Sequence, residues 1–303
     1  MLYRLSHVTS YEYYEPVSIS HHALRLQPRQ FSFQECRAHQ ITLDPAPSSE
    51  HFFTDYHGNH VATVTIESAH RQLTIRSAGV MEIFPRQRVQ PLETPAWEQV
   101  RDLSRGGQLG AALEASEFLF DSHYIRTGDD FADYAKTSFT KGRPILDAAL
   151  ELTARIYKEF TFDPKVTTIA TPLGEVLQKR RGVCQDFAHL QIACLRSLGL
   201  AARYVSGYIE TIPPPGKSKL AGADASHAWV SIFCHGYGWI DLDPTNNLIP
   251  STQHITVALG RDYADVSPVR GVIVGSGEHE LKVAVDMEPI ADDARPSESR
   301  PSQ

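Results

Sequence analysis

The sequence has few cysteines, and they follow no short repeated spacing. Only four of its 303 residues are cysteine: Cys36, Cys184, Cys194 and Cys234. A zinc site would need close pairs such as C-x2-C, and a chain of this length can build a core without disulfide staples. We therefore expect free thiols, no metal site and no cofactor.

The sequence also lacks an excess of positive charge and any long apolar run. Its formal net charge is -7 and its pI is near 6.0, whereas nucleic-acid binders usually carry a basic surface. No stretch approaches the ~18 apolar residues of a membrane helix, and the first ten residues do not resemble a secretory signal. These absences predict a cytoplasmic protein with no nucleic-acid or membrane partner. They predict no particular oligomeric state.

What is present is ordinary globular composition, with 42% hydrophobic and 21% charged residues, in a chain long enough for two domains. From the N-terminus to about Ile83 the pattern is β. Leu5, His7 and Thr9 alternate with other residues, and proline- and glycine-containing turns separate further strand-like runs. This pattern predicts a β-rich N-terminal domain over residues 1–90, built as a small antiparallel sandwich.

The middle of the chain is helical and the following part is mixed. Residues 144–157 form the clearest predicted helix, with Pro144 at its start. Residues 91–287 are therefore predicted to form a core of helices packed on an antiparallel sheet, including the C-terminal strands. Residues 288–303 are polar and proline-rich, which predicts a disordered tail. The fold class is α+β.

Cys184 is the first residue that carries a chemical hypothesis. It follows Gly182 and Val183 and directly precedes a long helix with an apolar stripe. The first turn of a helix has unpaired N–H groups and the positive end of the dipole, which favours a thiolate there. Free cysteine is also often simply buried, so Cys184 alone leaves a structural role open.

A thiol nucleophile needs a histidine and a group that orients it. His227 stands at the entrance of a predicted strand, and a turn at residues 235–238 leads into the next strand. That turn brings His227 opposite residues 243–247, so Asp243 is the predicted orienting carboxylate. Asp241 is expected to face solvent. The loop over residues 211–224 is expected to carry substrate specificity.

The sequence resembles bacterial transglutaminase-like proteins of the cysteine-protease subgroup, including their N-terminal region. The resemblance covers about residues 1–287. In the core it rests on RGVCQDFAH at 181–189, LGLAARYVSGY at 198–208, SHAW at 226–229 and WIDLDPTNN at 239–247. Outside the core it rests on HVTSYEY at 7–13, LRLQPR at 24–29, DYHGN at 55–59 and RDYADVSPVRG at 261–271.

The resemblance implies a papain-like core in which Cys184 attacks an amide carbonyl to form a thioester. His227 would act as base and then acid, and Asp243 would orient it. The implied substrate is a peptide or protein, and the predicted outcome is hydrolysis by a cysteine peptidase or amidase. Two alternatives stay open: acyl transfer from protein glutamine to amines, as in a transglutaminase, and a non-catalytic binding module with a residual triad.

Overall fold

The structure is a computed structural model that describes residues 1–105, 111–169, 171–211, 225–275 and 278–290. All of the predicted specificity loop except Thr211 lies outside these residues, as does the predicted tail from residue 291 onward. Among the described residues, no helix combines the length and apolar character that crossing a membrane requires.

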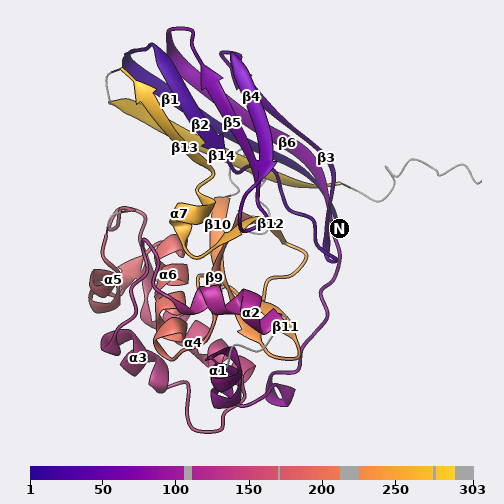
Figure 1. Cartoon of the computed structure of the whole chain (residues 1–303), viewed down its shortest axis with the longest axis vertical. Helices are drawn as coiled ribbons and strands as arrows, with labels where there is room; N and C mark the ends of the chain where they lie inside the picture. The colour runs from indigo at the N-terminus through magenta and orange to yellow at the C-terminus, as the bar shows by residue number, and fades with distance from the viewer. Residues whose placement is uncertain (106–110, 170, 212–224, 276–277, 291–303) are drawn as a thin grey trace, which may run out of the picture.

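The N-terminal region is a sandwich of two four-stranded antiparallel sheets, in the upper part of Figure 1. In β1, Tyr3, Leu5, His7 and Thr9 alternate as buried residues, as the sequence pattern predicts. Side chains from both sheets share one hydrophobic core. One sheet contains β1 (Leu2–Val17), β3 (Gln34–Asp44), β6 (His70–Ile83) and β14 (His279–Ile290), and the other contains β2 (Ile19–Leu24), β4 (Ser49–Thr54), β5 (His60–Ile66) and β13 (Val269–Val274).

The two C-terminal strands lie in a different place from the one expected. They do not join the core sheet: β13 pairs with β2, and β14 pairs with β1 from Leu2↔Ile290 to Tyr13↔His279. Residues 288–290 of the predicted tail belong to β14. The physical reason is that β1 and β2 would otherwise be sheet edges with unpaired backbone groups. Pairing between strands so far apart in the chain cannot be read from the local sequence pattern.

The second part packs helices on one face of an antiparallel sheet with strand order β11-β10-β9-β12. Its strands are β9 (Ala202–Ile209), β10 (Ala225–Cys234), β11 (Gly238–Leu242) and β12 (His254–Gly260). A separate parallel pair is formed by β7 (Thr161–Phe162) and β8 (Arg181–Gly182). The helices are α1 (Trp97–Arg105), α2 (Ala111–Ser116), α3 (Asp129–Lys136), α4 (Ile145–Glu159), α5 (Leu173–Lys179), α6 (Cys184–Ser197), α7 (Tyr263–Val266) and the 3-10 turns η1 (Pro91–Glu93) and η2 (Glu117–Leu119).

Helix α6 is central to this second part. Its residues from Asp186 to Arg196 are all buried, and it packs against β9 and β10. The helix predicted at residues 144–157 is α4, which packs beside α6. A helix that is buried on nearly all sides is stable only inside a core, so α6 fixes where its first residue, Cys184, can lie.

The sandwich is joined to the core sheet by two buried side-chain amides. Gln34 Nε2 donates to the Thr256 carbonyl at 2.7 Å, and its Oε1 accepts the Thr256 N–H at 2.7 Å. Asn59 pairs in the same two-point way with the N–H and carbonyl of Leu259, both at 2.8 Å. These amides satisfy the free edge of β12 as a neighbouring strand would.

Replacing Gln34 with methionine should destabilise the protein strongly. Gln34→Met keeps the size of the side chain but leaves the buried N–H and carbonyl of Thr256 without their side-chain partners. We expect the free energy of unfolding to fall by about 2 to 4 kcal/mol, measured by urea denaturation. The matched control Gln72→Met changes an exposed glutamine of β6 and should cost less than about 0.5 kcal/mol. Equal losses in the two variants would contradict the role of Gln34.

Candidate active site

Cys184 is placed by a tight turn at the start of α6. The Asp186 carboxylate folds back and accepts the Val183 N–H at 2.8 Å, and Thr167 Oγ1 donates to the same oxygen at 2.6 Å. A Cβ at Gly182 would lie 2.7 Å from this carboxylate, so only glycine fits. The turn leaves Cys184 at the first position of the helix and partly exposed.

His227 reaches the same region from β10. It pairs in register with Gly207 of β9, and a Cβ at residue 207 would lie only 2.0 Å from the Ile255 carbonyl oxygen and 2.6 Å from Trp229. The glycine therefore allows β12 and the Trp229 ring to pack closely beside His227. His227 is buried, with 7% of its surface exposed.

The hairpin of β10 and β11 brings Asp243 to His227 as the turn position predicts. Cys234 pairs with Gly238 across a short turn, and the register runs on to Val230↔Leu242. His227 Nε2 lies 2.7 Å from Asp243 Oδ2. The distance between these atoms is that of a strong, charge-assisted hydrogen bond.

The Asp243 carboxylate is fully buried and has a donor at each oxygen. Oδ1 accepts the backbone N–H groups of Thr245 and Asn246, at 2.9 and 3.1 Å. Oδ2 accepts from the side chains of His227, Asn246 and His254. Burial alone would raise the pKa of Asp243, but these hydrogen bonds and the charge of His227 hold it well below its usual range.

His227 is linked to Cys184 as well as to Asp243. Burial by itself lowers the pKa of His227, but hydrogen bonds to Asp243 and Cys184, and the charges of both groups, outweigh it and raise the pKa to about 10. Since Nε2 is occupied by Asp243, Nδ1 is the ring nitrogen left for the cysteine sulfur. The structure thus brings together the three residues that the sequence singles out.

Asn246 and His254 are site residues that were missed in the sequence. Asn246 Nδ2 donates to Asp243 Oδ2 at 2.8 Å, and His254 Nε2 lies 3.3 Å from the same oxygen. Asn246 had a local signal, because it lies three residues after Asp243 in the WIDLDPTNN run, close enough for a single turn to bring the two side chains together. His254 had none, since its place depends on the pairing of β12 with β9.

Among the described residues, His227, Asp243 and His254 form the group whose ligand atoms come close enough to hold a metal ion, within 4.8 Å of one another. In this arrangement both histidine Nε2 atoms already lie within hydrogen-bond distance of Asp243 Oδ2. Hydrogen bonds therefore account for the cluster without an ion. The absence of a metal stays a prediction.

Asp241 is not the solvent-facing residue that was expected. It is 8% exposed, accepts from Trp229 Nε1 at 3.1 Å and pairs with Arg86 at 2.6 Å. Burial would raise the pKa of Asp241, but Arg86 and the hydrogen bonds lower it below its ordinary value. The expectation was wrong because Arg86, whose guanidinium stacks 3.9 Å over Phe33, covers this face of β11.

Two family models match the chain. The bacterial transglutaminase-like N-terminal region matches residues 3–82, and the transglutaminase-like superfamily matches residues 132–244. Both matches confirm the resemblance found in the sequence motifs, and the second spans Cys184, His227 and Asp243.

One similar protein matches nearly the whole chain and another matches part of it. An uncharacterised protein of Mycobacterium tuberculosis strain H37Rv is 41% identical over 300 residues, which cover 96% of this chain and 94% of that protein. A protein-glutamine gamma-glutamyltransferase of Pseudomonas aeruginosa is 29% identical over 134 residues, 39% of this chain and 20% of its own length.

A solved structure supports the fold. The crystal structure of a protein from Cytophaga hutchinsonii, provisionally assigned as a cysteine protease, matches with a TM-score of 0.76 at 21% identity and covers 98% of this chain and 93% of its own. The predicted α+β class, a sandwich followed by a core of helices on an antiparallel sheet, is confirmed.

The high pKa of His227 should depend on the charge of Asp243. In Asp243→Asn the anionic partner is lost, so the pKa of His227 should fall by about 2 from about 10. NMR titration of the imidazole C–H resonances measures it. In the control His254→Gln, Asp243 keeps its charge and its contact with His227, and the pKa should stay near the wild-type value.

The same shift has a consequence for stability. Because the folded-state pKa of His227 is raised above its unfolded value of 6.5, its contribution is fully present below pH 6.5 and is lost as pH rises through about 10. In Asp243→Asn the free energy of unfolding should therefore change less with pH between 6.5 and about 10. An unchanged His227 titration in Asp243→Asn would contradict the pairing as the cause.

Proposed function

Because the chain belongs to the transglutaminase-like superfamily, we propose that it is a thiol enzyme that attacks a carboxamide or peptide bond through Cys184. The observation that carries this proposal is the hydrogen-bonded pair of His227 and Asp243 beside Cys184. A buried imidazole whose pKa is raised by a carboxylate and a cysteine is suited to hold a proton next to a sulfur nucleophile.

The three residues would share one proton-transfer cycle. The Cys184 thiol gives its proton to His227 Nδ1, and the sulfur attacks the carbonyl carbon, so that a C–S bond forms while the carbonyl π pair moves to oxygen. His227 then gives its Nδ1 proton to the amide nitrogen. The electron pair on oxygen re-forms the C=O bond as the C–N bond breaks, and ammonia or an amine leaves. The product is a thioester on Cys184. Asp243 keeps the imidazole oriented and stabilises its cationic form.

The oxyanion formed in this attack needs hydrogen-bond donors. Cys184 is the first residue of α6, and N–H groups in the first turn of a helix have no intrahelical acceptor. The backbone N–H of Cys184 would therefore donate to the oxyanion, and the helix dipole would add to its stabilisation.

The thioester would be resolved by a nucleophile that gives its proton to His227 and adds to the carbonyl carbon. The C–S bond then breaks, and the proton returns from His227 to the Cys184 sulfur. Water needs no binding site of its own, which supports hydrolysis by a peptidase or amidase as the main activity. Acyl transfer to amines is the second candidate. It is supported by the local similarity to the protein-glutamine gamma-glutamyltransferase of Pseudomonas aeruginosa, which covers 39% of this chain.

Cys184 should react with iodoacetamide faster than the other cysteines. Cys36 of β3 is a built-in control, because it is also partly exposed. Burial raises the pKa of the Cys36 thiol. At about pH 5.5 we expect alkylation of Cys184 to be at least about tenfold faster than that of Cys36, measured by peptide mass spectrometry.

In His227→Ala this advantage should disappear, because the sulfur loses its cationic partner. Cys36 should react at the same rate in both proteins, which controls for general unfolding. If Cys184 and Cys36 react equally in the wild type, the proposed nucleophile is wrong.

The products distinguish hydrolysis from acyl transfer. Glutamine-containing peptides incubated with and without an added primary amine should give mainly hydrolysed product in both cases, measured by mass spectrometry. Cys184→Ala should lower the rate more than about a thousandfold. Products coupled to the amine, without hydrolysis, would instead support the transglutaminase activity.

A further inference from the structure

A large open cavity lies between the sandwich and the second part of the chain. Its volume is about 1290 Å³. Loops of the sandwich line one side, and η2 and α2 line the opposite side. Arg203 of β9, Trp239 of β11 and residues of the stretch from Leu259 to Asp265 complete the lining. None of the three proposed catalytic residues lines it. Arg29, His57, Glu117, Arg203 and Trp239 are among the residues that line it.

Arg203 in the lining of this cavity has unused hydrogen-bonding capacity. Its guanidinium stacks 4.1 Å above the Trp239 ring, and its buried Nε has no hydrogen-bond partner. Among the described residues its guanidinium forms no ion pair. Burial, assisted by the charge of Arg29, lowers the pKa of Arg203 to about 10, with Asp241 and Glu117 opposing. An arginine held in this way is ready to bind a planar oxyanion.

Arg29 adds a second guanidinium group to the lining of the cavity. It donates to the His57 carbonyl and to Asn59 Oδ1, which are neutral acceptors. Two other arginines of the cavity do form ion pairs: Arg25 with Asp55 at 3.0 Å, and Arg261 with Asp265 at 2.9 Å. Within the described part of the chain, neither Arg29 nor Arg203 forms an ion pair, although the charge of Asp55 acts on Arg29 and the charges of Asp241 and Glu117 act on Arg203.

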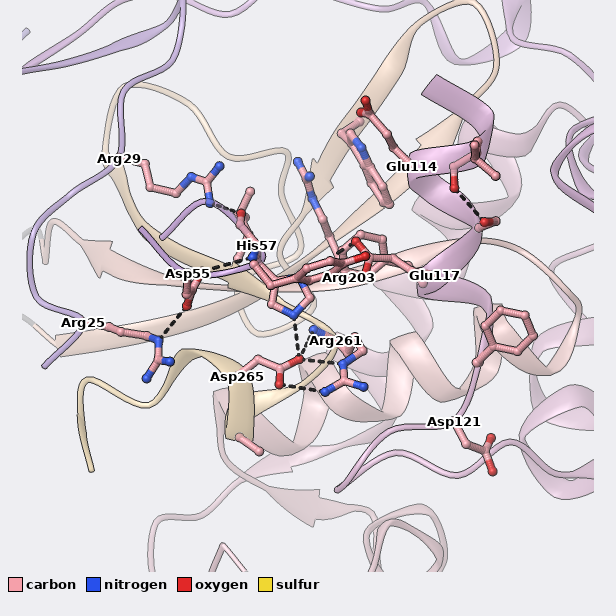
Figure 2. Close-up of a pocket in the computed structure, with 18 of the residues that line it drawn as sticks. Arg25, Arg29, Asp55, His57, Glu114, Glu117, Asp121, Arg203, Arg261 and Asp265 are labelled. Carbon is pink, nitrogen blue, oxygen red and sulfur yellow. Dashed lines mark hydrogen bonds and ion pairs between the residues drawn. The ribbon is translucent and has the colours of Figure 1, made fainter. Parts of the chain in front are cut away.

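Acidic residues lie on the facing wall. Figure 2 shows Glu114, Glu117 and Asp121 on the opposite side of the pocket from Arg25 and Arg29, with Arg203 between the two sides. Glu117 Oε1 lies 3.9 Å from His57 Nδ1, beyond hydrogen-bond distance. The sandwich wall carries Arg25, Arg29 and Asp55, and the facing wall carries carboxylates. The cavity therefore offers groups of both signs, which complements a ligand that carries both charges.

We propose that this cavity binds a short peptide by both of its free termini, with the carboxylate on Arg203 and Arg29 and the ammonium group facing Glu117. The volume, about 1290 Å³, exceeds the ~300 to 1,000 Å³ of pockets for drug-sized ligands. It therefore has room for several residues rather than for one amino acid.

The peptide site is separate from the proposed catalytic site. On β9, Arg203 pairs with Ser231 and Gly207 pairs with His227, so the two places are four residues, or about 13 Å, apart along the strand. The buried cluster of Val205, Trp229 and Leu259 lies between them. Binding in the cavity does not require the chemistry of Cys184.

Isothermal titration calorimetry on full-length Cys184→Ala tests this proposal without turnover. The probes are trialanine, trialanine amide, N-acetyl-trialanine and free alanine. Trialanine should bind, and each blocked peptide should bind about tenfold to a hundredfold more weakly, because one charge-assisted contact is lost. Free alanine carries both charged groups but makes fewer contacts with so large a cavity, so it should bind at least about tenfold more weakly than trialanine.

Two substitutions locate the site. Arg203→Gln should weaken trialanine binding by about tenfold to a hundredfold but leave the affinity for trialanine amide unchanged. Glu117→Gln should weaken trialanine binding by a similar factor but leave the affinity for N-acetyl-trialanine unchanged. Arg4→Gln is the matched control, since Arg4 is an exposed arginine paired with Glu288 on the sandwich, and it should change nothing.

The proposal is overturned if trialanine does not bind, if the blocked peptides bind equally well, or if free alanine binds as tightly as trialanine. Binding that survives Arg203→Gln would also overturn it. Should Arg203→Gln fail to fold, as judged by circular dichroism, the comparison of trialanine with its amide tests the carboxylate contact without any substitution.

Discussion

A buried carboxylate with a complete set of donors organises the candidate active site. Asp243 has no exposed surface, and burying a charge is costly unless hydrogen bonds replace water. The donors come from β10, from the turn after β11 and from β12. Each of these segments must be correctly placed for the Asp243 carboxylate to receive all of its hydrogen bonds. The need to supply these donors therefore also fixes the position of His227.

The placement of β12 depends in turn on the sandwich. Gln34 and Asn59 pair with the backbone of Thr256 and Leu259, and this strand carries His254 to Asp243. The N-terminal region is therefore part of the support of the candidate site. Arg86, in the connection between the two parts, adds a third link by pairing with Asp241 beside Trp229.

The sequence was sufficient for the features that depend on local pattern. The apolar helix after Cys184 predicts that this residue stands at a helix start, and the position of the turn between two strands predicts that Asp243 faces His227. Asn246 and His254 required knowledge of how a turn closes and how distant strands pair. Asp241 was misjudged for the same reason, because strand alternation tells which side a residue is on but not what covers that side.

The cavity between the two parts was beyond prediction for a related reason. Its walls come from segments separated by more than a hundred positions in the chain, such as Arg29 and Trp239. Each of these residues, taken alone in the sequence, gives no sign that it lines a shared cavity. Only the packing of the sandwich on the core sheet brings groups of both signs around one cavity.

The return of β13 and β14 to the sandwich means that the second part is an insertion between strands that belong together. Leu2 of β1 pairs with Ile290 of β14, so β1 is fully paired only after β14 has been synthesised. Sheets closed by such distant partners form slowly. During synthesis β1 and β2 remain open edges, exposed to mispairing with other chains, and a chain cut between the two parts would keep those edges open permanently.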